Sequence, residues 1–238
     1  MAAPLLEVEG VVKRFGGFTA LNRVTLEVRA GERFGLIGPN GSGKTTLINC
    51  VAGSLRADEG RIRLAGQDIT TLPPHRRTRL GIARSFQIPK PFTSMTVREN
   101  LEIPLEYAGH ARHGGAAEAA DILREIGLHA KAHLRPAGLT QIEMRKLELA
   151  RAMAARPKLL ISDEAMAGLS SAEVDDILAI LFRLSAQGIT IIMIEHIMRA
   201  VMRFSERIVV LDAGERIAEG TPAEIVRHPA VEKAYLGE

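Results

Sequence analysis

Two segments near the start of the chain alternate apolar and polar side chains. They cover residues 5–12 and 20–28, with the pair Gly16-Gly17 between them. Alternation with a period of two indicates strands that have one buried and one solvated face, which is typical of antiparallel sheets. We therefore expect an antiparallel unit at the start of the chain, followed by a further small β unit over residues 62–64 and 67–69.

Later segments are short apolar runs without alternation, as expected for strands that are covered on both faces. They cover residues 33–37, 159–163, 189–195 and 208–212, and a last short strand is predicted over residues 215–219. Helical patterns cover residues 45–52 and 172–185. Because strand–helix–strand order implies crossover connections, we expect a parallel sheet with helices packed against it.

The middle of the chain has a different pattern. Residues 101–155 are mostly helical in periodicity, interrupted by glycines and by Pro136, whereas residues 73–99 are rich in arginine and carry Pro89 and Pro91. Long regular elements are not expected in the arginine-rich part, because proline interrupts both helices and strands. The sequence therefore predicts an α/β fold whose two halves are separated by an inserted helical lobe.

The composition fits a globular protein and argues against a nucleic-acid partner. Of 238 residues, 46% are hydrophobic and 25% are charged, which allows one large domain or two small lobes with a sizeable core. The net charge of +3 is small, aromatic residues are scarce, and no run of Lys and Arg is long enough for a nucleic-acid-binding arm. The single cysteine, Cys50, excludes an intrachain disulfide, and its apolar surroundings predict that it is buried.

No membrane-targeting segment is expected. Residues 1–6 lack the charged and apolar regions of a signal peptide, and no apolar run reaches the ~18 residues of a membrane span. We therefore expect a cytoplasmic protein whose role at a membrane depends on a partner. The basic residues at 76–84 have two interpretations, a solvated face or a surface near such a partner or the anionic inner leaflet. These residues are Arg76, Arg77, Arg79 and Arg84.

A glycine-rich segment with one lysine follows the apolar run at 33–37 and opens the helix at 45–52. The pattern G-x-x-x-x-G-K-[ST] lets backbone N–H groups converge on phosphate oxygens, and the positive end of the helix adds to the attraction. Lys44 supplies a charge for the β- and γ-phosphates, and the Thr45 hydroxyl is placed to ligate Mg²⁺. This phosphate-binding loop, or P-loop, comprises Gly38, Pro39, Asn40, Gly41, Ser42, Gly43, Lys44 and Thr45.

Hydrolysis of a bound nucleotide also needs an acid that holds the metal ion and a group that orients water. Asp163 and Glu164 end one buried strand, and Glu195 and His196 end the next. Because the carboxyl ends of parallel strands line the ligand crevice, Asp163 is predicted near Mg²⁺ and Glu164 near the attacking water. His196 is either structural or a contact of the γ-phosphate.

These residues resemble the motifs of ABC-transporter nucleotide-binding subunits, and the resemblance extends over essentially the whole chain. The P-loop matches the Walker A motif, residues 159–164 match Walker B with its following glutamate, and residues 167–170 resemble the D-loop. Gln87 matches the Q-loop glutamine, which joins the metal site to the helical lobe, His196 matches the switch histidine, and Phe15 lies where the family has an aromatic ring under adenine. The resemblance implies ATP and Mg²⁺ as cofactors. It assigns Glu164, His196, Lys44 and Gln87 to catalysis, Phe15, the P-loop and Thr46 to nucleotide binding, and Thr45, Gln87 and Asp163 to the metal ion.

The resemblance also implies a fold and a division of the chain. We expect a P-loop NTPase core, made of a mostly parallel sheet with helices, that carries an N-terminal antiparallel β subdomain and an inserted helical subdomain. The whole of residues 1–238 would form a single ABC ATPase domain. Residues 1–87 and 157–238 would make up the RecA-like core with the antiparallel subdomain, and residues 88–156 the helical subdomain.

Further segments look like one branch of the family, which takes up branched-chain amino acids and also serves urea, amides and some aromatic acids. These segments are Gly16-Gly17 and residues 69–76, 81–87 and 232–237. The resemblance implies a second ATPase subunit, identical or different, integral-membrane permease subunits and, indirectly, a periplasmic solute-binding protein as partners. It implies that the chain is located in the cytoplasm, on the inner face of the plasma membrane, and that no nucleic acid is among its partners.

The signature segment departs from the family pattern. It usually reads L-S-G-G-Q or L-S-Y-G-Q and contacts ATP that is bound by the opposite subunit. Ile142 replaces a glycine whose missing side chain lets backbone N–H groups approach phosphate. We therefore hypothesise that this signature is impaired and that one of two composite ATP sites is slow. The alternative is that the loop shifts and hydrolysis is normal. The segment here is Leu139, Thr140, Gln141, Ile142 and Glu143.

Three other functions compete with transport. Soluble ABC ATPases that work on DNA or ribosomes usually carry tandem cassettes or long coiled-coil insertions, neither of which this sequence contains. A GTPase or kinase is disfavoured by Gln87, His196 and the missing N-K-x-D motif. A regulatory nucleotide binder with impaired hydrolysis stays open because of Ile142.

Overall fold

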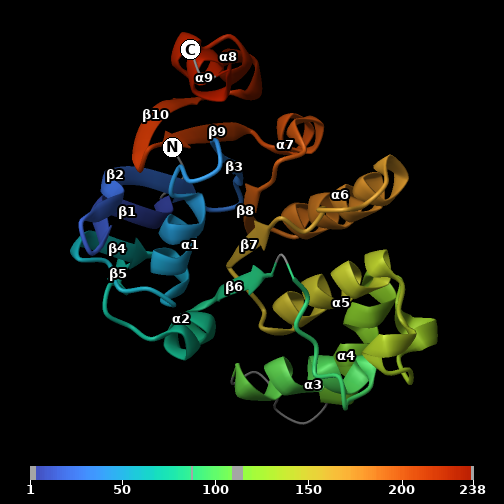
Figure 1. The fold of residues 1–238 in the computed structure, drawn as a ribbon. Coiled ribbons are helices and arrows are strands. Elements are labelled where there is room, and N and C mark those ends of the chain that lie inside the picture. The colour runs from blue at the N-terminus through green and yellow to red at the C-terminus, as the bar shows by residue number, and fades with distance from the viewer. Residues whose placement is uncertain (1–3, 87, 109–114, 237–238) are drawn as a thin grey trace.

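Two β-sheets and a group of helices make up the described part of the chain, residues 4–86, 88–108 and 115–236 of a computed structural model (Figure 1). The strands are β1 (Pro4–Phe15), β2 (Phe18–Arg29), β3 (Arg33–Ile37), β4 (Glu59–Leu64), β5 (Gln67–Asp68), β6 (Ile82–Ser85), β7 (Leu159–Asp163), β8 (Thr190–Ile194), β9 (Arg207–Asp212) and β10 (Glu215–Gly220). The α-helices are α1 (Lys44–Ala52), α2 (Pro74–Leu80), α3 (Val97–Tyr107), α4 (Gly115–Glu125), α5 (Gln141–Ala154), α6 (Ser171–Ala186), α7 (Met198–Phe204), α8 (Pro222–Val226) and α9 (Pro229–Leu236). Two short 3₁₀ helices, η1 (His129–Lys131) and η2 (Pro136–Gly138), precede α5.

The smaller sheet is antiparallel, as the alternating pattern predicts. Its strand order is β2-β1-β4-β5, and β1 pairs with both β2 and β4 in antiparallel register. The register pairs Phe15 with Phe18 across the Gly16-Gly17 turn, so β1 extends three residues beyond the predicted end at Val12. This hairpin places two phenyl rings at its tip.

The larger sheet has the order β10-β9-β3-β8-β7-β6, and its strands pair in parallel except for β10. Alternate residues of its strands enter two separate cores. Leu36 and Ile161 pack with α1 and the antiparallel sheet, whereas Ile37 and Leu160 pack with the helices on the opposite face. Coverage on both faces explains why these strands are continuously apolar. The parallel sheet and its crossover helices are therefore confirmed.

Helices α3, α4 and α5 form their own group, which lies at the lower right of Figure 1, across from the antiparallel sheet. This arrangement agrees with the expected helical insertion in a P-loop fold, although the boundaries at residues 87–88 and 156–157 stay predictions. Cys50 is buried and unpaired, as expected. No helix among the described residues is long and apolar enough to cross a membrane.

Two short elements lie in the arginine-rich segment that had no predicted structure. They are α2 and the edge strand β6, which pairs in parallel with β7. The sequence pattern hides β6 because Arg84 interrupts a strand of four residues, and the other three are buried in the sheet. Its guanidinium is tolerated there because it is ion-paired with Asp163 on the neighbouring strand.

Arg77 is 2% exposed, so both interpretations of the basic stretch as a surface are wrong for this residue. Its guanidinium donates hydrogen bonds to the carbonyl oxygens of Leu72, Cys50, Val51 and Thr70 at 2.6–2.9 Å. Two of these carbonyls belong to the last turn of α1, where the helix dipole favours a cation. Arg77 therefore holds α1, and with it the P-loop, against α2.

We predict that Arg77→Met lowers the free energy of unfolding by about 3 kcal/mol or more, because several buried carbonyl groups lose their donor. Urea unfolding of the purified chain measures this change. The neighbouring Arg76 is exposed, so Arg76→Met serves as the control and should change the free energy by less than about 0.5 kcal/mol. Equal losses in the two variants would contradict the structural role of Arg77.

Candidate nucleotide-binding site

The P-loop connects the carboxyl end of β3 to α1, and two of its glycines occupy positions that no other residue fits. Gly38 has a φ of 151°, and a Cβ atom there would lie 2.0 Å from the carbonyl oxygen of Leu211. Gly43 has a φ of 100°, and its Cβ atom would lie 2.7 Å from the carbonyl oxygen of Ala20. Side chains rarely adopt these φ values, so glycine at both positions sets the path of the loop.

Lys44 is the first residue of α1, and its buried ammonium group is directed back into the P-loop. Nζ donates hydrogen bonds to the carbonyl oxygens of Gly38 at 2.8 Å and Pro39 at 2.9 Å. Burial lowers the pKa of Lys44, and the nearby carboxylates of Glu164 and Asp163 oppose this shift. The two acids from β7 therefore lie within electrostatic reach of the loop cation.

One cleft collects most of the residues that the sequence predicts for nucleotide binding. Its walls come from the P-loop and α1, from the β1–β2 hairpin and from the carboxyl ends of β7 and β8. The predicted residues that line it are Phe15, residues 40–46, Glu164 and His196. The structure thus brings together side chains that lie up to 181 positions apart in the sequence.

Phe15 and Phe18 form the aromatic edge of this cleft. They are 47% and 64% exposed and face each other as a cross-strand pair. The ammonium group of Lys13 lies 5.5 Å from the centre of the Phe15 ring. Exposed rings at a polar cleft suit stacking on a nucleobase. Sequence reasoning did not assign Phe18 to the site. The signal that could have identified it is an aromatic residue directly after a glycine turn.

Asp163 ends β7 and is 6% exposed. Its Oδ2 accepts hydrogen bonds from Arg84, at 2.5 Å from Nη2 and 3.2 Å from Nε. A third nitrogen of the same guanidinium donates to the Asn49 side chain of α1 at 2.6 Å. The basic stretch was therefore also misread at Arg84, which points inward and connects β6, β7 and α1.

Glu164 follows Asp163 in a left-handed backbone conformation, with a φ of 48°. A residue with a side chain pays roughly 1–3 kcal/mol for this conformation, which persists only where neighbouring contacts enforce it. Its N–H donates to the carbonyl oxygen of Ile194 at 2.8 Å, and its Oε1 lies 3.1 Å from Nε2 of His196. Glu164 and His196, which were assigned separately from the sequence, are therefore in hydrogen-bond contact.

Glu195 is a buried carboxyl group beside this pair and was not assigned a role from the sequence. It is 3% exposed, and its Oε1 accepts a hydrogen bond from the N–H of Met166 at 2.8 Å. Burial raises the pKa of Glu195 to about 7, the Met166 hydrogen bond opposes this shift, and the charge of Glu164 adds to it. Glu195 thereby ties the loop that follows Glu164 to the end of β8.

The residues near the P-loop fit Mg²⁺. Mg²⁺ prefers oxygen ligands and is usually held by one or two carboxylates together with substrate phosphates. Thr45 lines the cleft, and the buried carboxylate of Asp163 lies within electrostatic reach of Lys44. Within the described ranges, no cluster of three or more acidic, His or Cys side chains forms a metal cage. Gln87, the third predicted ligand, lies outside the described residues.

The signature segment begins α5 and lies apart from the chain's own P-loop cleft. Thr140 caps the helix in a capping box with Glu143, whose carboxylate also accepts a hydrogen bond from Lys131 at 2.7 Å. Ile142 is half-buried against the helical core, and Gln141 packs over Gly168 of the D-loop. Leu139, Thr140 and Gln141 line a separate hollow on this side of the molecule.

The C-terminal helix α9 reaches the start of the P-loop. Burial raises the pKa of the Tyr235 phenol, and a hydrogen bond with the backbone of Gly38 opposes this shift. The last part of the chain is thus connected to the residue at which β3 enters the P-loop.

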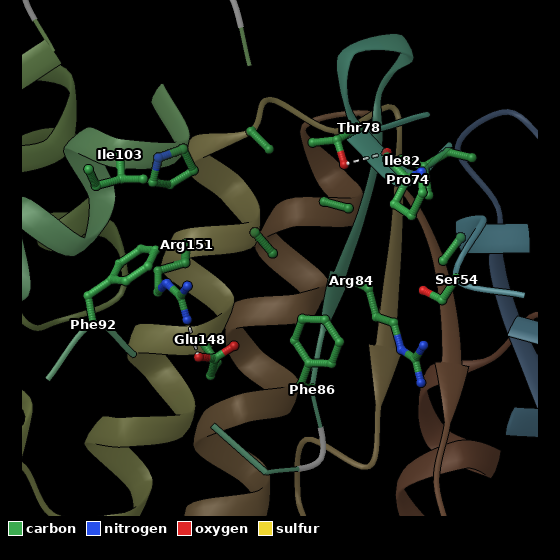
Figure 2. A pocket seen from close by; sticks show the side chains of 15 residues that line it. Ser54, Pro74, Thr78, Ile82, Arg84, Phe86, Phe92, Ile103, Glu148 and Arg151 are labelled. Atoms are coloured by element: carbon green, nitrogen blue, oxygen red, sulfur yellow. Dashed lines mark hydrogen bonds and ion pairs between the residues drawn. The ribbon is translucent and has the colours of Figure 1, made fainter. Parts of the chain in front are cut away.

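A second hollow, which we call the lobe groove, lies between β6 and α2 on one side and α3 and α5 on the other (Figure 2). Two arginines in it stack on exposed phenylalanines. The guanidinium of Arg84 lies 5.4 Å from the ring centre of Phe86, and that of Arg151 lies 5.0 Å from that of Phe92. Figure 2 shows the two pairs on opposite sides of the groove. Its principal lining residues are Ile82, Arg84, Phe86, Phe92, Ile103 and Arg151.

Comparison with known proteins agrees with this geometry. The sequence model of the ABC transporter family matches residues 21–167, which contain the P-loop, the signature and both acids of β7. The model of the branched-chain amino acid ATP-binding cassette transporter matches residues 215–238, which include Tyr235.

Curated relatives match the chain from end to end. It is 40% identical to the high-affinity branched-chain amino acid transport ATP-binding protein BraF of Pseudomonas aeruginosa, with 100% of both chains covered. It is 38% identical to the corresponding protein LivG of Escherichia coli, again with 100% of both covered. A probable LivG of Archaeoglobus fulgidus is 39% identical, with 98% of this chain and 95% of the relative covered.

Solved structures give the same assignment. A nucleotide-free ATP-binding cassette from an ABC transporter superposes with a TM-score of 0.90 at 34% identity and covers 99% of this chain and 100% of its own. A cassette in its ADP conformation also reaches a TM-score of 0.90, at 35% identity with 100% of both chains covered. The chain therefore belongs to the ABC transporter family, as an ATP-binding subunit related to those of branched-chain amino acid transporters.

Proposed function

We propose that the chain binds ATP with Mg²⁺ in the P-loop cleft and hydrolyses it to drive solute import through a membrane permease. One observation carries this proposal. Lys44, Glu164 and His196 line one cleft with two exposed phenylalanines, although they come from three different strand ends. A phosphate-binding cation, a carboxylate for water and an aromatic edge for a base are the parts that an ATPase needs.

In this proposal the P-loop holds the phosphates and the hairpin holds the base. The N–H groups at the start of α1 and the Lys44 ammonium bind the β- and γ-phosphates. Lys44 exchanges its hydrogen bonds to loop carbonyls for the phosphate oxygens. Phe15 stacks on adenine, and Phe18 closes the same edge.

The residues at the end of β7 and in the turn after it carry out hydrolysis in this proposal. Thr45, Asp163 and Gln87 would hold Mg²⁺, which would neutralise charge on the phosphates. Glu164 orients the attacking water and accepts its proton. His196 fixes the Glu164 carboxylate through the 3.1 Å contact between Nε2 and Oε1. The left-handed backbone at Glu164 directs this carboxylate into the cleft.

A second ATPase subunit and two permease subunits complete the proposed assembly at the inner face of the plasma membrane. A similar cassette at 25% identity and a TM-score of 0.83, with 91% of this chain and 98% of its own covered, forms a dimer bound to ADP and phosphate. In such a dimer each subunit offers its signature to the ATP of the other. The permease contacts the lobe groove, where Phe86 and Phe92 are 44% and 40% exposed.

Branched-chain or related hydrophobic amino acids are the proposed solute, delivered to the permease by a periplasmic binding protein. The full-length match to BraF and LivG supports this choice. Urea, amides and aromatic acids are the alternatives, since the solute does not contact this subunit.

We predict that cells that lack this chain regain uptake of labelled leucine when the wild-type chain is supplied. Lys44→Ala should lower that uptake by about 100-fold or more, because loss of one group that stabilises transferring phosphoryl charge has an effect of this size. Lys233→Ala, which changes an exposed lysine on α9, is the control and should support normal uptake. Restored uptake of urea or an aromatic acid, with none of leucine, would contradict the amino-acid assignment.

We also propose that the signature segment of this subunit supports only slow hydrolysis of the ATP that is bound by the partner subunit. Ile142 presents a β-branched side chain on the first turn of α5, where the family has glycine. Its partial burial against the helical core keeps this side chain in place. Backbone N–H groups at this helix end are therefore shielded from a phosphate of the opposite subunit.

We predict that Ile142→Gly raises the ATPase rate of the assembled transporter about threefold, which corresponds to less than about 1 kcal/mol of barrier. Ile142→Ala keeps the Cβ atom and should give a smaller rise. Thermal melting of both variants controls for the cost of glycine in a helix, about 1 kcal/mol. An unchanged or lower rate in a stably folded Ile142→Gly protein would refute the impaired signature.

A further inference from the structure

We propose that Arg84 is a positioning residue that links the lobe groove to the carboxylate of Asp163. A partner seated in the groove would then act on the metal-ion site through a single side chain. The inference rests on the proposed function, because it takes Asp163 as a ligand of Mg²⁺.

Arg84 is placed where three elements meet. It lies on the edge strand β6, and all three of its guanidinium nitrogens are engaged. Two of them donate to Oδ2 of Asp163 on β7, and the third donates to Oδ1 of Asn49 on α1, five residues after Lys44. The side chains of Arg84 and Asp163 are only 11% and 8% exposed, so solvent screens this ion pair weakly.

This geometry fixes how Asp163 presents its oxygens. Two donors on Oδ2 hold the carboxylate in one orientation, with Oδ1 as the oxygen that Arg84 does not engage. A planar guanidinium does this better than an ammonium group, because its donors have a fixed spacing. Residues that orient a metal ligand from behind typically change metal affinity by about 10–100-fold when they are mutated.

The opposite side of the same guanidinium faces the groove. Its central carbon lies 5.4 Å from the ring centre of Phe86, which is 44% exposed and belongs to the segment just after β6 (Figure 2). A partner that packs on Phe86 therefore presses on the group that holds Asp163. Arg84 thus both lines the groove and is ion-paired with Asp163.

Arg151 provides a matched control within the same groove. Its guanidinium stacks on Phe92 and is ion-paired with Glu148, which is 4% exposed. Glu148 lies on α5 and accepts a hydrogen bond from the N–H of Lys90, so this pair fastens the chain segment before α3. Both arginines stack on a phenylalanine and are ion-paired with an acid. Of the two acids, Asp163 is the one near the P-loop.

The test measures binding of a fluorescent, slowly hydrolysed ATP analogue to the purified full chain during a Mg²⁺ titration. Arg84→Lys keeps the charge but loses the two-donor geometry. It should raise the Mg²⁺ concentration at half-saturation by about 10-fold, while affinity for the analogue without Mg²⁺ stays within about twofold. Arg151→Lys should change neither quantity.

Phe86→Ala extends the test and covers the case in which Arg84→Lys fails to fold. In the assembled transporter, the permease should shift the Mg²⁺ half-saturation of wild type relative to the isolated chain. Phe86→Ala should remove that shift, whereas Tyr107→Ala, which changes an exposed ring outside the lining of the groove, should keep it. Circular dichroism melting establishes that each variant is folded.

The possible outcomes distinguish failure of the proposed function from failure of the positioning role of Arg84. A wild-type chain that does not bind the analogue would refute the proposed function itself. Mg²⁺-dependent binding that is equal, or tighter, in folded Arg84→Lys would overturn the positioning role alone. A wild-type half-saturation that the permease leaves unchanged, or a shift that persists in Phe86→Ala, would overturn the link to the groove.

Discussion

Parallel pairing of β3 with β8, and of β8 with β7, is the constraint on which the site depends. It ends three buried strands at one edge of the sheet, and each strand continues into a functional segment. The P-loop follows β3, Asp163 ends β7 and Glu164 follows it, and Glu195 and His196 follow β8. The two cores on either side of the sheet keep these ends in register, and Arg77 fastens α1 from behind through its carbonyl contacts. The positions of the cleft residues therefore depend on buried contacts that lie away from the cleft.

The turn at Glu164 uses that rigidity to hold an unfavourable backbone conformation. Its positive φ persists because three groups at and just after the end of β8 enforce it. They are the carbonyl oxygen of Ile194, the buried carboxyl of Glu195 and the imidazole of His196. Arg84 contributes to the same edge from β6 by holding Asp163. The acids of β7 thus have supports on both neighbouring strands. One of these supports also lines the groove in which the permease is proposed to dock.

The sequence predicted the parts of this arrangement that depend on apolar pattern and glycine spacing. β3 and β7 were predicted at their observed bounds, because strands covered on both faces read as short apolar runs. Features that depend on long-range pairing of charge were missed. Arg77 and Arg84 read as surface residues, since their partners include carbonyls of α1 that lie 26 and 27 positions from Arg77 and an acid that lies 79 positions from Arg84. The role of Phe18 was missed because this residue reaches the cleft only when the β1–β2 hairpin packs beside the P-loop.

The central claim is that this cleft binds ATP and that Glu164 promotes its hydrolysis. The most direct measurement compares wild type and Glu164→Gln in the assembled transporter, with ATP binding and ATP turnover followed on the same preparation. The account predicts that turnover falls by about 100-fold or more while the dissociation constant for ATP changes by less than about threefold, since the amide keeps the shape of the side chain but cannot accept a proton. Equal turnover in the two proteins would contradict the role of Glu164, and absence of ATP binding by wild type would contradict the account as a whole.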